Sequence, residues 1–308
     1  MCIVLQSFVI LSGLPVPAKR QLTPDHIMKM RTPLTRALAS LAAVLIFCSI
    51  AMGQAQQGAQ KASVWKYDGG NRSVGSGGPS PLHDLSGSWA GPRSGAGVPD
   101  SKQGDVAPLT ALGQQLFGGR KSLQKYDPTG TNDPVVRTCD PLGFPRADRY
   151  SIMAMAFATM SDRNVVLYQF QQQWREIWMD GRPLPKNVGA SGKDAPDPRY
   201  YGYSVGHWEG DNTLVVDTTG LDENTWLTDA GYPHSIDARV QERFTRRDHN
   251  DLELTLTVDD PKFYTKPFSL GTEYFRWVPD QILDERLCIP SNVIEYLKAV
   301  GDPAGKQP

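Results

Sequence analysis

The fold is decided by two neighbouring stretches, Arg239-Val-Gln-Glu-Arg-Phe-Thr245 and Leu252-Glu-Leu-Thr-Leu-Thr-Val258, which are joined through Asp248-His-Asn-Asp251. In the second stretch, leucine and valine alternate with glutamate and threonine, which is the period of a strand with one buried face. The polar residues between the two stretches are typical of a tight turn. We therefore predict a β-hairpin whose apolar face packs into a core.

The same pattern continues on both sides of this hairpin. Turn residues such as Asp180-Gly181 and Glu209-Gly-Asp-Asn212 separate further β-rich runs. The sequence holds about eight or nine candidate strands and no alternation of strands with long helices, which favours antiparallel β structure. The candidates are Ser88–Gly91, 165–170, 174–179, 201–208, 213–218, 239–245, 252–258, 272–278 and 282–287.

The triplet Gly87-Ser-Trp89 near the first candidate strand resembles the opening strand of lipocalin-type barrels. We predict a mainly β domain, an antiparallel meander that closes as a lipocalin-like barrel, with a β-sandwich as the alternative. Short peripheral helices are expected at 108–116, where Pro108 suits the first turn, and at 292–300, with Ser291 as its cap.

The N-terminal part of the chain has the features of an export signal. Lys29, Arg31 and Arg36 precede an apolar run from Leu38 to Met52, and small residues follow near Gly53. The run is shorter than the about 20 residues of a membrane span, so we predict a cleaved signal over 1–53 rather than an uncleaved anchor. Translation is expected to start at Met28 or Met30.

The remaining chain divides into three parts. Residues 54–84 are rich in glutamine, glycine and serine and are predicted to form a flexible tether. Residues 85–300 are predicted to form a single β domain, and 301–308 a tail. We expect no integral membrane span after cleavage, and a periplasmic or extracellular location.

Charge and cysteine content narrow the class of protein. The full chain has 32 basic and 33 acidic residues, and removing 1–53 takes away five basic residues and one acidic residue, which leaves a net charge of −5. This argues against a nucleic-acid partner. Two cysteines remain, Cys139 and Cys288, and an oxidising compartment predicts that they form a disulfide.

Several motifs in order resemble a family of secreted acidobacterial and proteobacterial proteins with no assigned activity. They include Cys139-Asp-Pro-Leu-Gly-Phe-Pro145, Asp180-Gly-Arg-Pro-Leu-Pro185, Gly202-Tyr-Ser-Val-Gly-His-Trp-Glu-Gly-Asp211, Pro233-His-Ser235 and Glu242-Arg-Phe244. The resemblance covers roughly 85–290, with Asn212 as an extra residue in one turn. It implies a secreted β domain and supplies no mechanism.

Glu242 is the most informative polar residue. It shares a strand face with Val240 and Phe244, so it is predicted to face the apolar interior. A buried carboxylate must be paired or protonated, and Arg175 is the candidate partner. It shares a face with Ile177, although the neighbouring tryptophans leave its facing open. A structural ion pair and a functional group are both consistent with this pattern.

The loop 220–237 is long enough to act as a lid or a binding loop. It carries Trp226 and His234, and His234 is a candidate acid or base beside Glu242. The alternative is that His234 only fixes the loop by hydrogen bonds.

The motif His207-Trp-Glu-Gly-Asp211 raises the question of a metal site, because His207 and Glu209 share a strand face. The ligand set is incomplete, so we predict no metal. Asp217 is either another interior carboxylate or a solvent-facing one. The sequence contains no phosphate loop, dinucleotide fingerprint or nucleophile elbow, and no cofactor is predicted.

These observations favour a secreted barrel that binds a small, partly apolar organic molecule. Its apolar walls would come from Trp89, Trp174, Trp178 and Trp226, and its polar contacts from Arg175, His207, Asp217, His234 and Glu242. One alternative is a lyase, isomerase or hydrolase that uses Glu242 and His234 as an acid–base pair. Another is a structural or interaction module of the cell envelope with a filled core.

Overall fold

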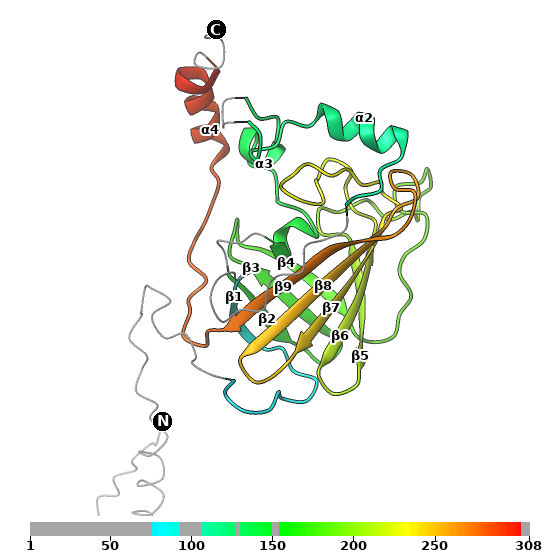
Figure 1. The fold of residues 1–308 in the computed structure, drawn as a ribbon, viewed down its shortest axis with the longest axis vertical. Coiled ribbons are helices and arrows are strands. Elements are labelled where there is room, and N and C mark those ends of the chain that lie inside the picture. The colour runs from blue at the N-terminus through cyan, green and yellow to red at the C-terminus, as the bar shows by residue number, and fades with distance from the viewer. Residues whose placement is uncertain (1–75, 93–105, 127–129, 150–153, 303–308) are drawn as a thin grey trace, which may run out of the picture. The chain divides into compact units, whose positions relative to one another are not determined.

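The computed structural model describes residues 76–92, 106–126, 130–149 and 154–302. Within them, nine strands follow one another in chain order around a closed barrel (Figure 1). The predicted signal region 1–53, most of the predicted tether and residues 303–308 lie outside the described part of the chain.

The barrel begins with a short strand and ends with a long one. The strands are β1 (Gly87–Ala90), β2 (Ala154–Thr159), β3 (Arg163–Tyr168), β4 (Gln173–Trp178), β5 (Tyr203–Glu209), β6 (Thr213–Thr219), β7 (Arg239–Arg246), β8 (Asp251–Asp259) and β9 (Phe268–Trp277). The helical elements are α2 (Ala111–Gly119), α3 (Pro134–Arg137), the 3₁₀ turn η1 (Arg146–Arg149), α4 (Pro290–Tyr296) and the π-helical turn η2 (Leu297–Gly301).

The prediction of a mainly β, lipocalin-like barrel is confirmed, with one difference in strand direction. β4 and β5 pair in parallel, with Ile177 opposite Ser204 and Trp178 opposite Val205. The connection 179–202 is long enough to carry the chain back along β4 before β5 begins, which a tight hairpin turn cannot do. The other strand pairs are antiparallel, including the β1–β9 pair that closes the barrel.

Some predicted elements differ in detail. β2 was not predicted, because its sequence Ala-Met-Ala-Phe-Ala-Thr lacks a clear alternation of apolar and polar residues. The candidate strand 282–287 is absent, and only Arg286 forms an isolated bridge, with Phe170. α4 begins at Pro290 with Ile289 as its N-cap and no side-chain cap, so Ser291 does not cap it. α2 is capped by Thr110, whose Oγ1 accepts from the Gly113 amide at 3.1 Å.

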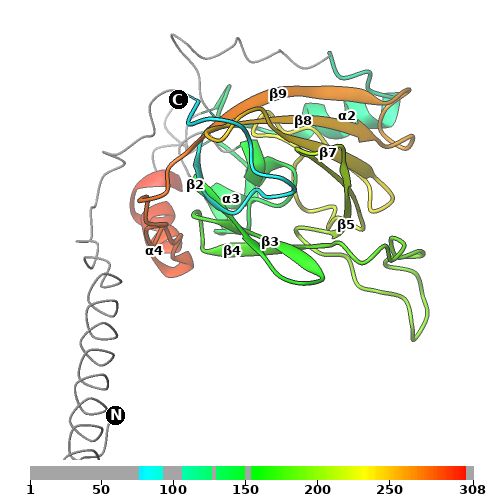
Figure 2. The same cartoon turned by 90° about the horizontal axis from the view of Figure 1, so that it is seen from below.

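Apolar side chains fill the barrel interior, and both ends are closed. At one end the Trp89 ring is fully buried and lies 5.0 Å from the guanidinium carbon of Arg246. At the other end, the segment from Cys139 to Arg149, which we name the closing segment, buries Leu142 and Phe144. Figure 2 shows the strands wrapping around this common interior. No helix in the described ranges is both long and apolar enough to cross a bilayer.

The last residues of the predicted tether contact the barrel. Ser76 and Gly78 carbonyls accept from the amides of Asn250 and His249 in the β7–β8 turn. The His83 ring stacks on Trp208 with the ring centres 5.0 Å apart. The described end of this segment is therefore held along two hairpin turns.

Candidate functional site

The candidate site begins with Glu242 in the middle of β7. Val240, Glu242 and Phe244 alternate with exposed or half-buried residues, and all three have an exposed fraction of 0 %. The prediction that Glu242 faces the interior is confirmed. Strand period explains this placement, because every second residue of β7 points into the barrel.

Arg175 reaches Glu242 from the opposite wall of the barrel. Its Nη2 donates to Glu242 Oε1 at 2.7 Å, so the predicted pair is confirmed. The Phe144 ring covers the guanidinium, with 4.1 Å between the guanidinium carbon and the ring centre. Both charged side chains are removed from solvent, and each depends on the other for compensation.

Two further residues complete a buried charged cluster that we name the interior cluster: Asp148, Tyr168, Arg175 and Glu242. The Tyr168 hydroxyl donates to Asp148 Oδ1 at 2.6 Å, and Asp148 Oδ2 lies 3.8 Å from Arg175 Nη2. Tyr168 extends from β3, whereas Asp148 belongs to η1. The closing segment and three barrel strands therefore supply one connected polar group inside an apolar core.

Burial and charge set the protonation of the cluster. Burial raises the pKa of Glu242 well above its ordinary range; Arg175 opposes this shift, and the charge and hydrogen bond of Asp148 reinforce it. Burial also raises the pKa of the Tyr168 hydroxyl, which stays protonated. Burial works against the charge on Arg175, but Glu242, Tyr168 and Asp148 together raise its pKa. The cluster therefore keeps one guanidinium charge and retains a proton on Glu242 to higher pH than an exposed glutamate does.

Several polar atoms of the cluster have no hydrogen-bond partner among the described residues. They are Asp148 Oδ2, Glu242 Oε2, and Nε and Nη1 of Arg175. Asp148 and Glu242 each contribute one of these oxygens. The two Arg175 donors remain, and buried donors in proteins nearly always have a partner.

A small cavity lies beside the cluster, between the closing segment and the barrel wall. It encloses about 10 Å³ and is lined by Asp148 and Tyr168 together with apolar side chains such as Leu142, Met155 and Phe275. A volume of this size holds about one water molecule. The cavity therefore places two polar side chains of the interior cluster next to an apolar surface.

Three of the predicted contact residues lie on the outer face of the barrel. Trp178 is covered by the guanidinium groups of Arg163 and Arg182, which lie 3.6 and 3.4 Å from its ring centre. His207 is exposed and lies 3.5 Å from Glu209. Asp217 accepts from Gln241 on the exposed side of β6 and β7. The structure does not bring Trp178, His207 or Asp217 to Glu242, because each occupies the outward phase of its strand. Trp174 is also outside, with 63 % of its surface exposed.

His234 lies in a different buried group from Glu242. Its Nε2 is 2.7 Å from Thr225 Oγ1, and its Nδ1 is 3.3 Å from the Ser235 carbonyl oxygen. Burial lowers the pKa of His234 to about 4, so the ring is neutral near pH 7. Neither of these hydrogen bonds reaches Glu242. In the described structure, His234 fixes the loop 220–237, which is the alternative that the sequence left open.

Trp226 packs in the same loop, between two arginines. The guanidinium carbons of Arg120 and Arg146 lie 5.3 and 5.6 Å from its ring centre. Arg146 in turn makes two hydrogen bonds to Asp133, at 3.0 and 2.6 Å. Trp226 therefore connects the loop to the closing segment through Arg146. Neither of its two arginine contacts involves the interior cluster.

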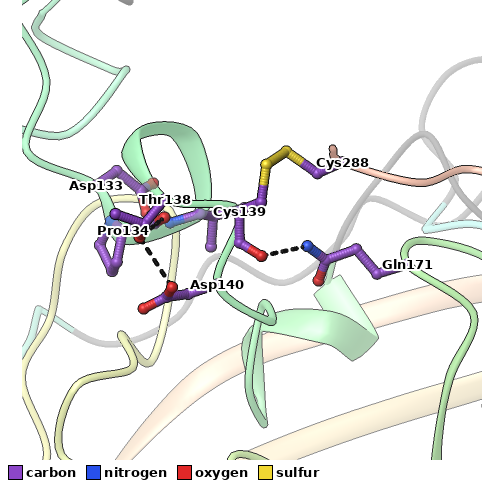
Figure 3. Close-up of a disulfide and its surroundings, with 8 residues drawn as sticks. Asp133, Pro134, Thr138, Cys139, Asp140, Gln171 and Cys288 are labelled. Carbon is purple, nitrogen blue, oxygen red and sulfur yellow. Dashed lines mark hydrogen bonds between the residues drawn. A yellow bond between two sulfur atoms is a disulfide. The ribbon is translucent and has the colours of Figure 1, made fainter. Parts of the chain in front are cut away.

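The predicted disulfide between Cys139 and Cys288 is confirmed, with 5.4 Å between the two Cα atoms (Figure 3). Within the described ranges, no three or more histidine, cysteine, aspartate or glutamate side chains gather in a way that could hold a metal ion.

Sequence reasoning missed Asp148 and Tyr168. Tyr168 carried a usable signal, because it follows Val166 on the inward phase of β3. Asp148 carried none, since it lies in a short 3₁₀ turn with no periodic pattern. No family model matches this chain, and no curated protein does.

Proposed function

We propose that this chain is a secreted β-barrel protein that binds a small, partly apolar organic molecule, and that the interior cluster holds the polar end of that molecule. The proposal rests on two unpartnered donors of Arg175. The side chain is buried, yet its Nε and Nη1 have no hydrogen-bond partner in the described structure. Such donors favour an acceptor that the protein itself does not supply.

The charges of the cluster limit the chemistry of the ligand. The guanidinium charge of Arg175 is already compensated by the neighbouring carboxyl groups of Glu242 and Asp148. A second anion would add an unpaired charge to a buried site, which is strongly unfavourable. An uncharged acceptor oxygen, as in a ketone, an ester or an amide, satisfies the free donors without this penalty.

The apolar side chains of the cavity wall favour a ligand whose remaining part is apolar. Leu142, Met155 and Phe275 line the cavity beside Asp148. An organic ligand is larger than one water molecule, so its entry requires the part of the closing segment from Leu142 to Asp148 to move outward. That segment contributes three lining residues: Leu142, Ala147 and Asp148.

The disulfide supports the secreted part of the proposal, because disulfides form and persist in oxidising compartments. Periplasmic and extracellular locations both meet this condition.

Ligand-observed NMR with a panel of neutral ketones, esters and amides tests the proposal. At least one compound is expected to bind the wild-type protein, and Arg175→Met is expected to abolish that binding. Arg243→Met is the matched control, because Arg243 lies next to Glu242 on β7 but pairs with Glu209 on the outer face. Equal binding by both variants would contradict the proposal.

The raised pKa of Glu242 supports a second candidate, an acid–base enzyme that uses the Asp148–Glu242 pair rather than His234. A raised carboxyl pKa beside a second carboxyl is the arrangement of a general acid. Once a ligand is known, Glu242→Gln separates the two candidates. An enzyme loses turnover by about 10²–10⁴-fold, whereas a binder retains its ligand with a modest loss of affinity.

A further inference from the structure

The C-terminal arm, which we define as Ile282–Asp302, is held by little packing: its buried residues are Leu297 and Gly301 in η2. α4 contains no buried residue. Its large apolar side chains Ile294 and Tyr296 are exposed by 49 and 46 %, and Ile289, just before the helix, by 42 %. Because apolar burial is the main source of packing energy, this helix gains little from its position beside α3.

Few noncovalent contacts among the described residues fix the arm. At its start, the Gln171 amide donates to the Arg286 carbonyl at 2.6 Å. Near its end, Arg137 and Asp302 form an ion pair at 3.1 Å with both side chains partly exposed. Exposed ion pairs contribute little. The covalent bond from Cys288 to Cys139 is therefore the main restraint on the arm (Figure 3).

The barrel itself closes without this bond. Cys139 precedes β2 and Cys288 follows β9, so neither cysteine belongs to a strand. Closure comes from the β1–β9 ladder, with Trp89 opposite Trp277 and Ala90 opposite Arg276. Breaking the disulfide therefore releases the arm while the strand ladders stay in place.

An open groove gives access to the disulfide. It has a volume of about 340 Å³, and its lining consists mainly of apolar side chains around one half of the bridge. The lining residues are Val136, Leu287, Cys288, Ile289, Asn292, Val293, Tyr296 and Leu297. Cys288 is half-buried and lines the groove, whereas only 9 % of Cys139 is exposed, so Cys288 is the more accessible half of the disulfide.

We propose that the Cys139–Cys288 disulfide is a redox latch on the C-terminal arm, and that the groove beside Cys288 docks a reducing partner protein with a reactive dithiol. Because Cys288 is part of the groove lining, a protein that docks there can place its own thiol next to the disulfide. This indicates a dithiol protein as the partner. This inference concerns the arm and stands apart from ligand binding at the interior cluster.

The exchange proceeds in two balanced steps. A thiolate of the partner attacks Cys288 Sγ, forms a mixed disulfide, and expels Cys139 as a thiolate that takes up a proton. The partner's second thiol, on losing its proton, attacks the mixed disulfide and releases Cys288, which is protonated in turn. The chain gains two electrons and two protons, and the partner's dithiol becomes a disulfide.

Reduction of the purified, oxidised protein by thioredoxin and by dithiothreitol tests the latch. Thiol alkylation followed by mass spectrometry gives the reduction rate, and hydrogen exchange follows each segment. We expect reduction without denaturant to be faster than global unfolding. It should raise amide exchange across 282–302 while strands β5 to β8 stay protected.

Two substitutions on α4 test the docking groove. Val293→Asp places a charge in the lining, and it is expected to slow reduction by thioredoxin about tenfold while leaving the dithiothreitol rate unchanged. Ile294→Asp is the matched control, because Ile294 is the next residue and is not part of the lining. Reduction only at the rate of global unfolding, unchanged exchange in the arm, or equal slowing by both variants would overturn the proposal.

Discussion

Strand β4 contributes one residue to each of two arginine–glutamate pairs, one on either face, and the two pairs differ sharply in their exposure to solvent. Arg175 points inward and donates to Glu242 at 2.7 Å, while its neighbour Glu176 points outward and accepts from Arg163, also at 2.7 Å. The inner side chains are 1 and 0 % exposed, and the outer ones are 25 % (Arg163) and 37 % (Glu176) exposed. Contact distance therefore does not measure the importance of an ion pair.

The buried pair is expected to affect the free energy of unfolding far more than the exposed pair. Water screens the outer pair, which also shares Arg163 with Asp162. The inner pair has lost its hydration, so each partner strongly depends on the other. Substitutions that separate the two environments make the comparison quantitative.

The largest effect is expected from Arg175→Met. It leaves the buried carboxyl groups without their cation, and loss of one partner of a buried pair lowers the free energy of unfolding by about 3–5 kcal/mol. Urea denaturation measures this loss. The double variant Arg175→Met/Glu242→Leu is expected to recover part of it, because Asp148 is then the one carboxyl group of the cluster left without its cation. A double variant as unstable as the single one would show that packing, not charge, dominates the cluster.

The next effect concerns His234 and its pH dependence. Its folded-state pKa of about 4 lies below the ordinary value of 6.5, so the unfolded chain binds the proton more readily. Its contribution to stability is therefore complete above pH 6.5 and is lost as the pH falls toward 4, by up to about 1.4 kcal/mol per pH unit. His234→Gln is expected to flatten this part of the stability profile.

His207→Gln serves as the control for His234, since His207 is exposed on β5 and changes its surroundings little on unfolding. Stability profiles between pH 4 and 7, measured by thermal melting, compare the two variants. The same slope in wild type and His234→Gln would refute the assignment of a buried neutral ring.

A smaller effect is expected from Tyr168→Phe. The substitution removes the 2.6 Å hydrogen bond to Asp148 and leaves one carboxylate oxygen without its donor. The expected loss is about 1–3 kcal/mol in the free energy of unfolding. Chemical denaturation monitored by tryptophan fluorescence measures it. No loss would mean that a water molecule replaces the hydroxyl.

The smallest effect is expected from Glu176→Gln on the outer face. Because the partner Arg163 is open to solvent and also contacts Asp162, the denaturation midpoint should not change measurably. A shift as large as that of Tyr168→Phe would show that solvent exposure does not determine how much each ion pair contributes to stability.

Alternating residues explain how much of this arrangement could be predicted from the sequence. The leucines of 252–258 specified a half-buried strand, and the same period placed Glu242 and Arg175 inside and made them partners. The parallel β4–β5 pair could not be predicted, because it depends on how the irregular connection 179–202 returns. Asp148 was missed for a related reason, since a 3₁₀ turn places its side chain by tertiary packing alone. The assignment of Trp178, His207 and Asp217 to an interior site failed because residue type was given more weight than strand phase.

Native mass spectrometry of the protein, purified gently from its source compartment, tests the central claim most directly. We expect an extra mass on the wild-type protein and on Arg243→Met that is lost on denaturation and is absent from Arg175→Met. A bare protein mass in all three samples, together with no binding of the neutral carbonyl panel, would contradict the account and leave the interior cluster as a structural element of a filled barrel.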